Sequence, residues 1–138
     1  MRIAAHPQLY SADGPAPPEL KGGRCRSCGY VFFPPHRYGC EVCGAPSGGL
    51  EPVALAGRGV LRSFATVHFH QGPGIEAPFT VGSIVLDEGP AIHAVLTCRS
   101  GEGLRSGDRV RSILVTQGQD GSGNEIVELR FEKAEDHP

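Results

Sequence analysis

The chain has 138 residues and a formal net charge of −2, from 13 basic and 15 acidic side chains. That length accommodates one compact domain with a small appendage, and the nearly balanced charge argues against a general affinity for polyanions. No apolar run approaches the roughly 20 residues of a bilayer span, and residues 1–10 lack the apolar stretch of a secretory signal. We therefore expect a cytoplasmic protein with no membrane span, whose cysteines stay reduced and can act as metal ligands.

A proline-rich lead-in occupies residues 1–23. It holds few large apolar residues, and prolines stand at positions 7, 15, 17 and 18. Proline removes a backbone donor and breaks helices, so this composition excludes a long helix. We predict an extended segment.

Two Cys-x-x-Cys-Gly motifs follow, at 25–29 and 40–44, within a module that we place at 24–52. Each motif can give two thiolates to one tetrahedral ion, and the glycine lets the backbone turn tightly around the sulfurs. Four thiolates leave no open coordination position, which predicts one structural zinc. Iron held as in rubredoxin is an alternative that the colour of the protein would reveal. The predicted ligands are Cys25, Cys28, Cys40 and Cys43.

The segment between the two motifs is rich in apolar and aromatic residues, including Phe32, Phe33 and Tyr38. A unit this small cannot bury all of them, so the segment either packs on the rest of the molecule or forms a contact surface; both readings stay open. Zinc with four thiolates carries a charge of −2, which cancels most of the positive field of the nearby arginines.

Beyond the module, apolar and β-branched runs are separated by Gly-, Pro-, Asp- and Ser-rich turns, with no helical periodicity. Five strands are the number in an OB-fold barrel, so we predict a mostly β protein with an N-terminal zinc ribbon, an OB-fold at 53–133 and a tail at 134–138. The predicted strands are Val60–Phe69, Thr80–Leu86, Ala91–Thr97, Arg109–Thr116 and Glu125–Glu132.

Two glycine-containing segments have local explanations. Gly57-Arg58-Gly59 leads into a strand, whereas a dinucleotide-binding motif must follow a strand and open a helix, so we read it as a bend at the barrel entry. Asp87-Glu88-Gly89-Pro90 lies between two apolar runs and marks a hairpin. We attribute its two acidic residues to solvation of the turn.

Other reactive side chains give weak signals. His68, His70 and His93 lack a carboxylate partner, so a polar strand face explains them better than a second metal or a catalytic site. Cys98 stands at a strand end without a nucleophile motif, which favours a small buried side chain.

OB-folds often bind single-stranded nucleic acids, and this function must be weighed. Such surfaces stack bases on aromatic side chains surrounded by positive charge. The segments 81–86 and 91–96 contain no aromatic residue, and the chain has no tryptophan. A core or a protein partner suits these strands better. Nucleic-acid binding and electron transfer by an iron-loaded ribbon remain alternatives.

The order of the motifs resembles a known family, the stand-alone rubredoxin-like zinc-ribbon and OB-fold proteins, once described as a domain of unknown function. The similar features cover about residues 18–133. They are Arg24-Cys25-Arg26-Ser27-Cys28-Gly29, Phe32-Phe33-Pro34-Pro35, Cys40-Glu41-Val42-Cys43-Gly44, Gly57-Arg58-Gly59-Val60-Leu61, Ala77-Pro78-Phe79 and Leu86-Asp87-Glu88-Gly89-Pro90. Many relatives begin with a longer helical lead-in, which this proline-rich chain lacks.

The resemblance implies an accessory subunit in a hetero-oligomer with a thiolase-like enzyme, which holds the catalytic cysteine while the small subunit stabilises it and helps form an acyl-CoA site at the shared interface. The family takes part in the degradation of aromatic and steroid acyl-CoA esters, in phloroglucinol metabolism and in archaeal mevalonate synthesis. No catalytic residue is expected in this chain. The excess of aromatic and arginine residues around the ribbon predicts the partner or CoA surface. Its residues are Arg24, Arg26, Phe32, Phe33, Arg37 and Tyr38.

Overall fold

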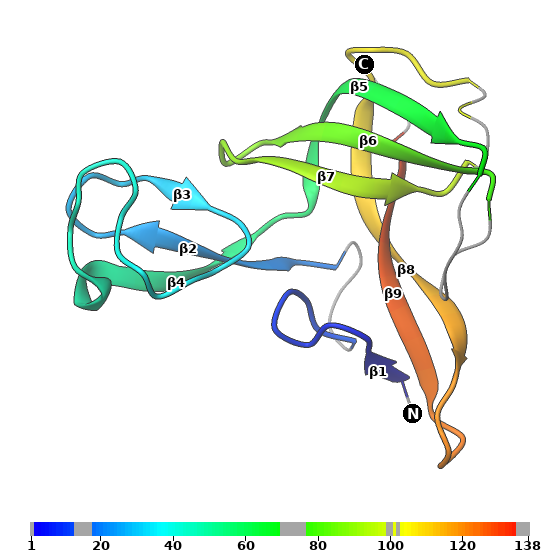
Figure 1. Ribbon diagram of the computed structural model, residues 1–138, viewed down its shortest axis with the longest axis horizontal. Helices are drawn as coiled ribbons and strands as arrows, with labels where there is room; N and C mark the ends of the chain where they lie inside the picture. Colours follow the sequence, from blue (N-terminus) through cyan, green and yellow to red (C-terminus); the bar gives the residue numbers. More distant parts are fainter. Residues whose placement is uncertain (1, 13–17, 70–76, 99–100, 102, 135–138) are drawn as a thin grey trace.

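The computed structural model (Figure 1) describes residues 2–12, 18–69, 77–98, 101 and 103–134. These residues form nine β-strands and one short 3-10 turn at Ser47–Gly49. Within this part of the chain, no helix has the length and apolar character that a membrane crossing requires. The molecule is almost entirely β, as predicted.

The larger unit is a closed five-stranded barrel. Its strands follow one another in the order β9-β7-β6-β5-β8, and β8 pairs again with β9. The closing contact between β7 and β9 is parallel, at Leu96 and Phe131, and the other pairings are antiparallel. This is the OB-fold arrangement, and the largest difference from the predicted strand ends is in β8, which continues to Gln119. The strands are β5 (Arg58–Val67), β6 (Phe79–Leu86), β7 (Ala91–Leu96), β8 (Arg109–Gln119) and β9 (Glu125–Lys133).

The smaller unit is a three-stranded antiparallel sheet in the order β3-β2-β4, which projects from the side of the barrel (Figure 1). Its strands are β2 (Leu20–Cys25), β3 (Val31–Phe32) and β4 (Leu50–Leu55). β2 pairs with β4 along its whole length, from Leu20 opposite Leu55 to Cys25 opposite Leu50. The sheet thus extends past 24–52 on both sides, because the residues before the first cysteine already belong to β2.

Ribbon and barrel share one hydrophobic core. Leu20 and Leu55, at the base of the ribbon sheet, are fully buried and belong to the same cluster as the barrel residues. Val31, Phe33 and Val53 pack against this cluster from the ribbon side. Burial of these side chains removes apolar surface from water and couples the two units energetically. The barrel members are Leu61, Ile84, Leu86, Ile92, Leu96, Val110 and Phe131.

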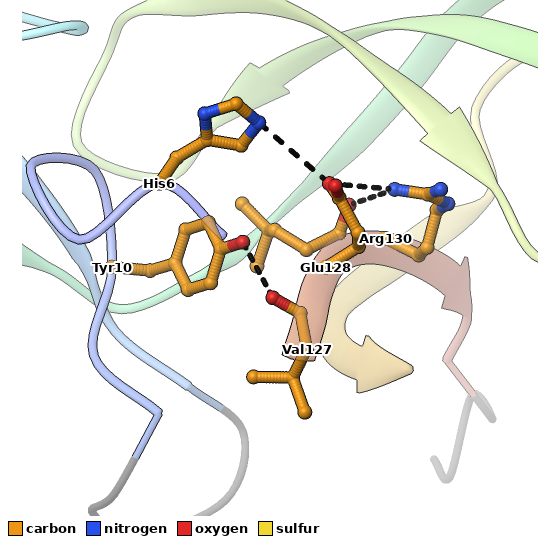
Figure 2. A network of polar contacts seen from close by, with 6 residues as sticks. His6, Tyr10, Val127, Glu128 and Arg130 are labelled. Atoms are coloured by element: carbon orange, nitrogen blue, oxygen red, sulfur yellow. Dashed lines mark hydrogen bonds and ion pairs between the residues drawn. The ribbon is translucent and has the colours of Figure 1, made fainter. Parts of the chain in front are cut away.

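The lead-in is tied to both units. Strand β1 (Arg2–Ala4) pairs in parallel with the start of β9. Tyr10 is buried, forms a bridge with Leu20 of the ribbon, and donates its hydroxyl to the carbonyl oxygen of Val127 in β9 at 2.8 Å. Figure 2 shows this bond. Residues 2–10 therefore connect the ribbon sheet to the barrel, in addition to the shared core.

A polar network lies beside Tyr10 (Figure 2). The Oε2 atom of Glu128, in β9, lies 3.8 Å from Nε2 of His6 and 3.5 Å from Nη1 of Arg130. The Arg130 side chain is mostly buried and also donates to the carbonyl oxygen of Leu129 at 3.0 Å. The network satisfies a guanidinium that would be costly to bury alone.

The predicted bend at the barrel entry is present. Gly57 has a φ of +72°, and a Cβ at this position would collide with the Ser112 hydroxyl and the Pro18 carbonyl. Ser112 donates to that carbonyl at 2.6 Å. Glycine is needed here because both the backbone angle and the close approach exclude a side chain.

The acidic hairpin between β6 and β7 corrects our sequence interpretation. Asp87 does not merely solvate the turn, because it accepts two hydrogen bonds of 2.8 Å from Arg109 of β8. Glu88 accepts a hydrogen bond of 2.8 Å from the backbone N–H of Ala56, in the segment that joins the ribbon to the barrel. The hairpin is thus bonded to β8 and to the segment at the barrel entry. The sequence alone does not reveal these contacts, because the partners lie far from the hairpin along the chain.

Candidate metal centre

Four cysteine sulfurs form a compact cluster at the far end of the ribbon. The Sγ atoms of Cys25 and Cys43 are 3.6 Å apart, as are those of Cys28 and Cys40. All four lie within 4.8 Å of one another. Zinc–sulfur bonds of about 2.3 Å in a tetrahedron require sulfur–sulfur distances of about 3.8 Å. The cluster therefore fits one tetrahedral zinc ion, with every predicted ligand in reach.

The two knuckles have the same backbone design. In each, the glycine after the second cysteine donates its N–H to the carbonyl of the first cysteine, at 2.8 Å for Gly29 and 2.9 Å for Gly44. Both glycines have positive φ angles, +81° and +77°. This turn points successive backbone N–H groups at the sulfur cluster, as the 3.4 Å approach of the Cys43 N–H to the Cys40 sulfur illustrates.

These N–H groups favour the thiolate form of the first cysteine in each knuckle. The backbone N–H of Cys28 lowers the pKa of Cys25 to about 6, and that of Cys43 lowers the pKa of Cys40. The N–H of Ala45 acts on Cys43 in the same sense, but hydrogen bonding to Cys25 and burial raise the pKa of the Cys43 thiol to about 12. A zinc ion would displace the remaining protons and bind four thiolates.

The predicted aromatic residues divide into buried and exposed members. Phe32 is 5% exposed and packs over Gly23, where a Cβ would collide with its ring. Phe33 is half-buried against the shared core. Tyr38 is 94% exposed, and Val42, in the second knuckle, is 63% exposed. Part of the segment therefore packs as expected, Tyr38 faces solvent, and a contact surface here stays a prediction.

The predicted arginines also divide. Arg24 and Arg26 both contact the carboxylate of Glu51, with N–O distances of 3.2 and 3.3 Å. Arg24 and Glu51 are direct cross-strand neighbours in β2 and β4. Arg37 is exposed, and no ion pair joins it to another residue in the part of the chain that the structure describes.

The weaker sequence candidates that lie among the described residues do not assemble into a metal site. His68 follows β5 and His93 is exposed on β7, while His70 lies outside the described residues. Among the described residues, the four cysteines are the only group of three or more potential ligands close enough to share a metal ion. Cys98 is half-buried and packs against the barrel core, as a small apolar side chain would.

Sequence reasoning missed three residues around the ribbon. His36 stacks between Phe32 and Tyr38, Val42 is exposed within the second knuckle, and Glu51 forms ion pairs with two arginines. The strand register that opposes Glu51 to Arg24 was the missing information for the ion pairs. No spacing rule would have indicated the stacking of His36.

Fold and site together define a protein that joins a closed structural zinc site to an OB-fold barrel. The chain belongs to the family of ChsH2: residues 12–47 match the rubredoxin-like zinc ribbon domain of ChsH2, and residues 52–116 match its C-terminal OB-fold domain. This supports zinc as the metal of the cysteine cluster.

Several named proteins are similar to this chain in sequence or in fold. The chain is 35% identical, over 93% of its length and 86% of the relative's, to the benzoylsuccinyl-CoA thiolase subunit BbsA of Thauera aromatica. It is 28% identical to a DUF35 domain-containing scaffold protein of Methanothermobacter thermautotrophicus, over 74% of this chain and 78% of that one. Its fold resembles a chain in the structure of the Ltp2-ChsH2(DUF35) aldolase, with a TM-score of 0.65, 23% identity, and coverage of 83% and 84% of the two chains.

Proposed function

We propose that this chain is a zinc-binding, non-catalytic accessory subunit of a cytoplasmic thiolase-superfamily enzyme that acts on acyl-CoA esters. The observation that carries this proposal is the 35% identity to a benzoylsuccinyl-CoA thiolase subunit across both the ribbon and the barrel. The relatives described as scaffold proteins point in the same direction.

The chemistry of the described residues supports a non-catalytic role. Four thiolates fill the coordination sphere of zinc and leave no position for a substrate or water. The ion would therefore stabilise the ribbon rather than activate water. The buried Tyr10 donates its hydroxyl to the carbonyl oxygen of Val127, and Cys98 packs on the core. The Tyr30 hydroxyl donates to the Glu41 carboxylate at 2.6 Å, but this hydrogen bond raises the pKa of Tyr30, which keeps the phenol protonated and a poor nucleophile.

The surface proposed for the partner and for CoA lies at the tip of the ribbon. Tyr38 and the arginines at 24, 26 and 37 are its exposed members, and aromatic and arginine side chains commonly anchor interfaces. We assign Phe32 and Phe33 to its support, because they pack inward. Arg24 and Arg26, already paired with Glu51, would contribute through their remaining donors.

Purification of the tagged chain from its own cell tests this function. We expect a thiolase-superfamily subunit to co-purify in a fixed ratio, with one zinc per small subunit. The isolated chain should turn over no acyl-CoA, whereas the complex should be active and stay active with Cys98→Ala in the small subunit. Acyl-CoA turnover by the isolated chain, lost on Cys98→Ala, would overturn the assignment. Retardation of labelled single strands would favour the nucleic-acid alternative, and a red protein would favour iron.

A further inference from the structure

Four rings form a continuous stacked row along the loop between the knuckles. Tyr30 and Phe32 have ring centroids 6.0 Å apart, Phe32 and His36 are 4.4 Å apart, and His36 and Tyr38 are 5.5 Å apart. The angles between successive ring planes are 26°, 29° and 23°. The row begins at half-buried Tyr30, includes the buried ring of Phe32 and ends at Tyr38, the most exposed large apolar side chain among those described.

The row is held in place along its length. The hydroxyl of Tyr30 donates to Glu41 at 2.6 Å, next to the first cysteine of the second knuckle. The Tyr38 backbone N–H donates to Nδ1 of His36 at 3.3 Å. Phe32 packs where Gly23 leaves room for its ring. A ring that is already positioned loses little conformational freedom when a second flat group stacks on it, so Tyr38 presents a pre-organised platform.

Arg37 lies next to this platform and, unlike Arg24 and Arg26, forms no ion pair with another described residue. The single carboxylate of Glu51 contacts both Arg24 and Arg26, so that group keeps a formal charge of +1, and the Glu41 carboxylate accepts the Tyr30 hydroxyl. Arg37, the residue before Tyr38, keeps its donors available among the described side chains. An exposed aromatic face beside an arginine suits a flat heteroaromatic ring that carries a phosphate, because the ring stacks and the phosphate accepts bidentate hydrogen bonds.

We infer that Tyr38 and Arg37 form a binding site for the adenine nucleotide end of the acyl-CoA substrate, with adenine stacked on Tyr38 and a phosphate held by Arg37. This inference rests on the proposed function, since a CoA ester is the ligand that brings such a group to the ribbon. It reassigns the phosphate contact to Arg37 alone. The acyl group and the pantetheine arm would then extend towards the enzyme partner.

Titration of the zinc-loaded full chain with adenosine 3′,5′-bisphosphate, at concentrations up to the order of 10 mM, tests the site directly. We expect shifts of the Tyr38 ring resonances and quenching of tyrosine fluorescence, which no tryptophan obscures. Tyr38→Ala should weaken binding about tenfold, and Tyr38→Phe should retain it because the ring remains. Arg37→Ala should weaken binding of the bisphosphate but not of adenosine.

Matched controls are available on the barrel. Phe69, which is 78% exposed, and Arg62, which is exposed on β5, lie outside the ribbon, so Phe69→Ala and Arg62→Ala should leave the titration unchanged. Saturable shifts confined to barrel resonances, or loss of binding in these two variants only, would overturn the inference. So would the absence of any shift at Tyr38 over the whole titration.

The active complex separates this inference from the proposed function. In the Tyr38→Ala complex we expect KM to rise about tenfold for an acyl-CoA and to stay unchanged for the corresponding acyl-pantetheine, which lacks the nucleotide. If the complex forms and neither KM changes, the inference fails and the proposed function stands. If Tyr38→Ala prevents co-elution with the enzyme subunit, Tyr38 is a protein anchor and the inference fails. If no thiolase-like subunit co-purifies but the bisphosphate binds at Tyr38, the proposed function fails and the site stands.

Discussion

The ribbon and the barrel reach a defined structure by different means. The barrel has five paired strands around a buried apolar cluster, so water exclusion supplies its stability. The outer ribbon has a two-residue strand, β3, and leaves Tyr38 and Val42 exposed, so its order must come largely from the metal. A metal-held loop can present side chains to a partner that a self-sufficient core would bury.

Zinc removal should have the largest effect, and it should be local. Chelation, or Cys43→Ser, should release the metal and abolish amide protection in residues 24–45, while β8 and β9 stay protected. Hydrogen exchange followed by mass spectrometry on the apo and zinc-loaded chain measures this. Equal loss of protection in barrel and ribbon would show that the metal stabilises the whole molecule. Because protons compete with the ion for the four thiolates, acidification should also weaken zinc retention.

Loss of a shared core side chain should affect both units. Leu20 is fully buried and joins the ribbon to the barrel cluster, so Leu20→Ala should cost about 2–5 kcal/mol of unfolding free energy. Val42→Ala, at an exposed ribbon position, serves as the control and should change stability by less than about 0.5 kcal/mol. Denaturant unfolding monitored by circular dichroism provides both values. A Leu20→Ala chain with unaltered barrel stability would contradict the shared core.

The tie between the lead-in and β9 should contribute less. Tyr10→Phe removes the hydroxyl that donates to Val127 and should cost about 1 kcal/mol, with faster amide exchange in β1. Burial raises the pKa of Tyr10, so the neutral hydroxyl persists through the physiological range. Ser11→Ala, at the exposed neighbouring residue, is the control. Unchanged exchange in β1 would mean that strand pairing alone holds the lead-in.

The hairpin ion pair should have the smallest effect. Hydrogen bonds from Arg109 hold the pKa of Asp87 below its usual value, so this pair stabilises the fold at neutral pH and the contribution is lost as the pH falls below about 4. Both side chains are more than one-third exposed, so solvent screening limits the effect to less than about 1 kcal/mol. The difference in stability between wild type and Asp87→Asn at pH 7 should shrink at pH 3. A difference that is the same at both pH values would contradict an ionic contribution.

Local sequence signals predicted much of the fold but little of the ribbon surface. The strands of the barrel and the bend at Gly57 follow from apolar periodicity and glycine chemistry, which act over a few residues. The short strands of the ribbon carry no comparable periodicity, and β1 escaped prediction because its pairing partner, β9, lies at the other end of the chain. Glu51 and Arg24 meet only through the register of β2 and β4.

By itself, the sequence determined the metal ligands, the order of ribbon and barrel, and the family resemblance, because cysteine spacing and strand patterning are properties of neighbouring residues. Tertiary structure alone decided which side chains of the ribbon are available. Phe32 packs inward over Gly23, and Glu51 forms ion pairs with two of the three candidate arginines. Tyr38 and Arg37 are exposed to solvent. Exposure and ion pairing depend on contacts between strands distant in the chain, whose free energies no local pattern encodes.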